Sequence, residues 1–180
     1  MDWQYRLFIV LAPLSAVVSV ATLLYARGFP RPVARATFGL SWLVAFLVGW
    51  LTLNTCELIA PSPAATLFWA KMTYVFIGAT PVAWLVFAAR YTGRQDWVTP
   101  IHLAWLCAIP VFIGALALTN DWHSLVWESY EFLPVPGGLT MRVVAYGPGF
   151  WINMVYGYGM VIAGAVLIGR QHLTSFRLYR

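Results

Sequence analysis

Long runs of apolar residues, separated by short polar segments, make up most of the chain. Five such runs lie at about 5–26, 36–58, 64–89, 98–118 and 149–170. Each run approaches the ~20 residues that a helix needs to cross a bilayer. A helix is the expected structure of each, because lipid offers no other partners to the backbone of an open segment. The pattern predicts an all-α polytopic membrane protein, with a bundle of five transmembrane helices in a single domain over residues 1–180.

One longer polar segment, residues 119–148, separates the fourth run from the fifth. Within it, residues 122–132 have aromatic and apolar groups at helical spacing, which predicts a short helix lying at the membrane interface. Two short extended runs follow around Gly137-Gly138, a pattern typical of a β-hairpin. We therefore expect this segment to form a small cap over one end of the bundle.

The charges indicate how the bundle is oriented. The chain is 61% hydrophobic and only 9% charged, whereas a soluble domain is about 25% charged. Its net charge of +5 comes from arginines in residues 27–35, in residues 90–97 and in the C-terminal tail. These three segments lie on one side of the membrane if the five helices alternate in direction. Cationic loops stay on the cytoplasmic side. The N-terminus and the cap are therefore expected outside and the C-terminus inside, with membrane lipids rather than nucleic acid as partners.

Three separated sequence motifs point to a known family. Residues 67–94, LFWAKMTYVFIGATPVAWLVFAARYTGR, fit W-x-K-x-x-Y-x-x-I followed by a proline, an aromatic residue and Y-T-G. Residues 119–127, TNDWHSLVW, fit T-N-x-x-H-x-x-x-W, and residues 146–158, YGPGFWINMVYGY, contain G-P-x-F-W-x-x-x-x-Y-x-Y. Together they resemble the seven-helix N-terminal membrane region of bacterial histidine kinases. Thr73 departs from that pattern, since the family often has an acid beside the lysine.

The resemblance implies a sensory input region in the bacterial cytoplasmic membrane, and it covers the first five of seven helices. The sequence contains neither an H-E-x-x-x-P phosphoacceptor motif nor a glycine-rich ATP-binding segment, so we expect the chain to be non-catalytic. We also expect no cofactor, because no histidine lies at mid-membrane.

An accessory structural subunit of a larger membrane complex, bioenergetic or light-harvesting, is the alternative function. Its helices would pack against other membrane subunits or against a second copy of the chain. The gene sequence after Arg180 separates the two classes, since two further helices and a kinase core would indicate sensing.

Six residues near the outer end of the bundle form a candidate ligand-binding site: Glu57, Lys71, Tyr74, His123, Trp127 and Trp151. An intramembrane charge usually has a partner, so Lys71 is predicted to pair with Glu57 at the end of the second helix. In the alternative interpretation, the Lys71 ammonium group extends alone to the lipid headgroups.

The motif TNDWHSLVW has two interpretations. As a lid, it would close an outer pocket bounded by the six candidate residues, with Asn120 and Asp121 capping a short helix. His123 would then sense a ligand or a proton, since its ordinary pKa lies near ~6.5. As an anchor, its tryptophans would join an interfacial aromatic belt, and side chains would fill the space beneath the loop. His123 would then be a loop residue bonded to backbone.

Overall fold

The structure is a computed structural model that describes residues 2–27, 31–135 and 139–178. The elements follow one another as α1 (Asp2–Arg27), α2 (Arg31–Leu58), α3 (Pro63–Tyr91), the 3-10 helix η1 (Gln95–Trp97), α4 (Pro100–Leu118), α5 (Asn120–His123), β1 (Trp127–Val135), β2 (Leu139–Tyr146) and α6 (Pro148–Leu178).

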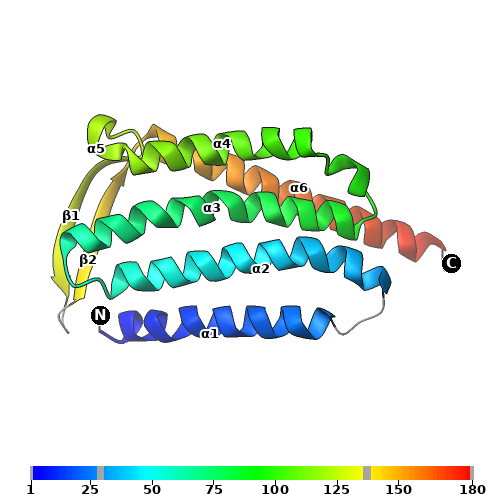
Figure 1. The fold of residues 1–180 in the computed structure, drawn as a ribbon, viewed down its shortest axis with the longest axis horizontal. Helices are drawn as coiled ribbons and strands as arrows, with labels where there is room; N and C mark the ends of the chain where they lie inside the picture. Colours follow the sequence, from blue (N-terminus) through cyan, green and yellow to red (C-terminus); the bar gives the residue numbers. More distant parts are fainter. Residues whose placement is uncertain (1, 28–30, 136–138, 179–180) are drawn as a thin grey trace.

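Five long helices run side by side and alternate in direction (Figure 1). The helices α1 to α4 form a row in this view, and α6 packs mainly against α3. The β-hairpin covers the end of the bundle where the chain begins, and the C-terminus lies at the opposite end (Figure 1). The helix α3 is central, because it packs against α2, α4 and α6.

Length and apolar composition fit a membrane bundle. Within the described residues, four helices contain spans long and apolar enough to cross a membrane: Gly39–Leu58, Pro63–Tyr91, Pro100–Leu118 and Pro148–Leu173. The helix α1 contributes a shorter apolar stretch, Pro13–Tyr25. The predicted all-α polytopic membrane bundle is confirmed. The helices α2 and α6 are longer than predicted, since α2 begins at Arg31 and α6 continues to Leu178.

The helices α3 and α4 begin in the same way. The side chain of Ser62 accepts a hydrogen bond from the backbone of Ala65, and Thr99 accepts one from His102. A proline at the first helical position follows each of these capping residues, where it costs no backbone bond. The Y-T-G motif ends α3, because Gly93 adopts a left-handed backbone with φ of 76°.

The predicted helix over residues 122–132 is wrong. The helix α5 is a single turn that ends at Ser124, whose φ of 53° is left-handed. Trp127 then begins β1, which pairs antiparallel with β2 from Trp127↔Tyr146 to Val135↔Leu139. Aromatic residues favour strands, so the strand pairing overrode a helical spacing that was only local. The predicted hairpin is confirmed in its two strands, whereas Gly137-Gly138 lie outside the described residues.

Candidate functional site

Trp127 is the centre of a packed core between the cap and the bundle. Its side chain is 1% exposed, and its ring meets Tyr74 edge-on with the ring centroids 5.3 Å apart. The other buried members of this core are Ala70, Ile113, Ala117 and Val126. Side chains thus fill the space beneath the loop at this point, and Trp127 faces protein rather than lipid.

Asn120 holds Trp127 in place. Its Oδ1 accepts hydrogen bonds from the backbone of Val126 at 2.9 Å and of Trp127 at 3.0 Å, and its Nδ2 donates to the carbonyl of Trp127 at 3.0 Å. One buried amide thereby satisfies three backbone groups that would otherwise lack partners. The prediction that Asn120 and Asp121 cap a short helix is wrong, because Thr119 occupies the N-cap position.

The predicted ion pair between Glu57 and Lys71 is also wrong. Glu57 Oε1 accepts from Arg142 Nε at 3.1 Å and Nη2 at 3.0 Å, whereas Lys71 Nζ donates to Asp121 Oδ2 at 2.6 Å. The cap folds back over the helix ends and brings a nearer opposite charge to each residue. Consequently, one pair joins α2 to β2 and the other joins α3 to α5.

Arg142 ties the Glu57 pair to the tryptophan core. Its guanidinium carbon lies 4.6 Å from the centroid of the Trp127 ring, in a cation–π arrangement. The side chains of Arg142 and Glu57 are 11% and 18% exposed, so this pair is largely removed from solvent. Asp121, in contrast, is half exposed.

Sequence reasoning missed Arg142, because no helical spacing relates it to Glu57. The available signal was that Arg142 is the only arginine or lysine in residues 119–148. Within the described residues, its Nη1 and the Nε1 of Trp127 are buried without a hydrogen-bond partner.

His123 is bonded within its own loop. Its Nδ1 accepts from the backbone N–H of Leu125 at 3.0 Å, and its Nε2 lies 3.1 Å from Thr119 Oγ1. Thr119 in turn donates to the carbonyl of Ala115, so the proton on the neutral imidazole belongs on Nε2. This geometry fits the interpretation of His123 as a loop residue bonded to backbone.

The six candidate residues therefore separate into groups. The structure brings Glu57, Tyr74 and Trp127 together around Arg142, and it places Lys71 in its own pair with Asp121. His123 stays in its loop, and Trp151 is half exposed on α6 with its ring against Phe150. A ligand-binding role for these residues stays a prediction.

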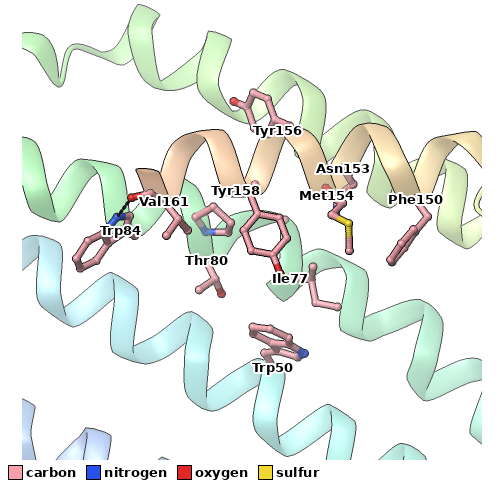
Figure 2. A pocket seen from close by; sticks show the side chains of 13 residues that line it. Trp50, Ile77, Thr80, Trp84, Phe150, Asn153, Met154, Tyr156, Tyr158 and Val161 are labelled. Atoms are coloured by element: carbon pink, nitrogen blue, oxygen red, sulfur yellow. Dashed lines mark hydrogen bonds between the residues drawn. The ribbon is translucent and has the colours of Figure 1, made fainter. Parts of the chain in front are cut away.

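A second polar feature lies deeper in the bundle, where α2, α3 and α6 line an open cavity of ≈ 360 Å³ (Figure 2). On its wall, Trp84 Nε1 donates to the carbonyl of Val161 at 3.0 Å and so joins α3 to α6. Gly164 is required for this contact, because a Cβ atom there would overlap the indole ring of Trp84. Among the described residues, no group of three or more His, Cys, Asp or Glu side chains could hold a metal ion.

Comparison with protein families identifies the bundle. The family model described as the N-terminal 7TM region of histidine kinase matches residues 10–180. The chain belongs to this family. The resemblance seen in the three motifs is thereby confirmed, and the 7TM region is an input module of the kinase rather than its catalytic core. No curated protein and no solved structure matches the chain.

In this member of the 7TM family, the motif residues meet at the cap. Tyr74 of the first motif packs against Trp127 of the second, and Lys71 pairs with Asp121 inside the second motif. In the third motif, Gly149 donates its N–H to the carbonyl of Leu125. The start of α6 is therefore bonded to the loop that contains the second motif. Segments far apart in the sequence thus form one joint at the end of the bundle.

Proposed function

We propose that the chain is the non-catalytic sensory input module of a histidine kinase in the bacterial cytoplasmic membrane. The family match over residues 10–180 carries this proposal. The cap and the N-terminus face outside, and the C-terminus faces the cytoplasm. Arginines on the side opposite the cap support this orientation: Arg27 ends α1, Arg90 lies in the last turn of α3, Arg94 follows α3, and Arg170 lies in the C-terminal third of α6.

The cap is connected to the helices that would carry a signal. Arg142 reaches Glu57 on α2, and Asp121 reaches Lys71 on α3, so a displacement of the cap acts on two helices at once. The helix α3 runs from this joint to Tyr91 at the opposite end of the bundle. A stimulus would shift the packing of these helices only if it binds two arrangements of the helices with different affinities.

Autophosphorylation of the full-length gene product tests the proposed function. Membrane vesicles containing the wild type, Arg142→Met or Glu128→Gln would receive labelled ATP. Glu128 is exposed on β1, so Glu128→Gln is the matched control. We expect Arg142→Met to change the phosphorylation rate several-fold and the control to leave it unchanged. A wild type that incorporates no phosphate, or equal rates at equal amounts of folded protein, would contradict the proposal.

Cysteine labelling on intact cells tests the orientation. Cys56 and Cys107 are both free, so they are first replaced by serine. A membrane-impermeant maleimide should then label Glu128→Cys in the cap and should not label Gln95→Cys at the opposite end. The reverse pattern would overturn the outside location of the cap.

A further inference from the structure

The cavity between α2, α3 and α6 lies within the membrane-spanning parts of all three helices. In Figure 2, Tyr158 projects from α6 toward Trp50 on α2, and α3 forms the floor between them. The volume of ≈ 360 Å³ falls in the range of small-molecule sites, about 300–1,000 Å³. The helices α2 and α6 hardly touch each other, so among the described residues the cavity is open between them.

Half of the polar side chains on this wall are satisfied within the protein. Thr80 Oγ1 donates to Phe76 at 2.7 Å, Tyr156 donates its hydroxyl to Leu106 at 2.6 Å, and the indole of Trp84 donates to α6. In each case the acceptor is a backbone carbonyl. These groups have no need of an outside partner.

The other half have no hydrogen-bond partner among the residues that the structure describes. The indole N–H of Trp50, the amide of Asn153 and the hydroxyl of Tyr158 line the same cavity, and none bonds to another residue that the structure describes. Water is scarce in the membrane interior, so a polar group without a partner is costly there. The wall therefore calls for a molecule that brings its own acceptors.

A neighbouring transmembrane helix fits this requirement less well than a small molecule. Its backbone carbonyls are already engaged in its own hydrogen bonds, so only a polar side chain could serve as acceptor. The indole and phenol walls of the cavity match a flat ring instead.

We propose that the cavity binds a neutral, flat, apolar ring that carries carbonyl oxygens and an apolar tail, the chemistry of a membrane quinone. The carbonyl oxygens accept hydrogen bonds from Trp50, Asn153 and Tyr158, and the tail extends into lipid between α2 and α6. The role of this ligand as the stimulus of an input module rests on the proposed function, whereas the binding site itself does not.

Binding of tritiated menaquinone-4 to the full-length gene product in nanodiscs tests this site, with empty nanodiscs as background. Trp50→Phe, Asn153→Leu and Tyr158→Phe each remove a donor and keep an apolar group in its place. Each should weaken binding by roughly 3–10-fold, the usual worth of one hydrogen bond. Trp105→Phe is the control and should leave binding unchanged, because Trp105 is exposed on α4 and does not line the cavity.

The naphthalene analogue, in which hydrogen replaces both carbonyl oxygens, separates hydrogen bonding from simple partition into lipid. We expect it to bind at least tenfold more weakly than menaquinone-4. Absence of saturable binding, equal binding of the analogue, or unchanged affinity in all three donor variants would overturn the site. A loss of binding with an unaltered melting temperature supports it. These results do not depend on phosphorylation, so the proposed function is judged separately.

Discussion

The cap joint and the cavity between α2, α3 and α6 differ in where their polar groups find partners. At the cap joint, Asn120 bonds three backbone groups, and Glu57 and Lys71 each find an opposite charge. Of the described groups at this joint, Arg142 Nη1 and Trp127 Nε1 are buried without a hydrogen-bond partner. In the cavity, Asn153 and Tyr158 line an apolar space and bond to none of the described residues. Both regions lie near apolar helices, where an unpaired polar group is expensive.

Polar side chains therefore have two different roles in this membrane bundle. Polar groups that find partners inside the chain hold elements in fixed positions, as at the cap. Polar groups that find none inside the chain are suited to a molecule from outside it. Removal of a side chain should therefore destabilise the protein at the cap joint and leave stability nearly unchanged at the cavity.

The largest effect is expected at Arg142. Arg142→Met leaves the Glu57 carboxylate without its partner in a largely buried place, which costs about 3–5 kcal/mol of unfolding free energy. In Glu57→Gln/Arg142→Met, no charge is stranded, so most of that loss should be recovered. Unfolding of the single and double variants in detergent measures both values, and strict additivity would show that the pair is not formed.

The next largest effect is expected at Asn120, and Asn153 in the cavity serves as its matched comparison. Asn120→Ala strands three buried backbone groups and should cost roughly 3 kcal/mol, because each lost bond leaves a desolvated group behind. Asn153→Ala removes an amide that bonds to no described residue and should change the unfolding free energy by about 0.5 kcal/mol or less. Equal losses at the two positions would break the comparison.

The sequence predicted the apolar helices and the hairpin strands, but not the contacts between cap and bundle. Apolar runs of membrane length admit one structure, so the five long helices follow from composition and spacing alone. The partners of Glu57 and Lys71 depend on how the hairpin folds back over the helix ends, which local spacing does not encode. The aromatic residues from 127 to 132 fit both a helix and a strand, and long-range pairing with β2 decides between them.

The smallest effect is expected at the second ion pair. Asp121 is half exposed, so the pair with Lys71 is partly screened by solvent. Asp121→Asn should cost about 0.5–1 kcal/mol, and high salt should reduce this difference. Unfolding at low and high ionic strength measures it, and a loss as large as that at Arg142 would show that both pairs are equally buried.

Fluorine NMR with fluorinated tryptophan and dissolved oxygen tests the contrast between the two regions most directly. The chain has 10 tryptophans, and Trp50→Phe and Trp127→Phe assign the two resonances that matter. Oxygen concentrates in lipid, so it should shift the Trp50 resonance strongly and the 1% exposed Trp127 hardly at all. Menaquinone-4 should then protect Trp50 and leave Trp127 unchanged. A Trp50 resonance as insensitive to oxygen as that of Trp127 would contradict an open cavity beside a closed cap.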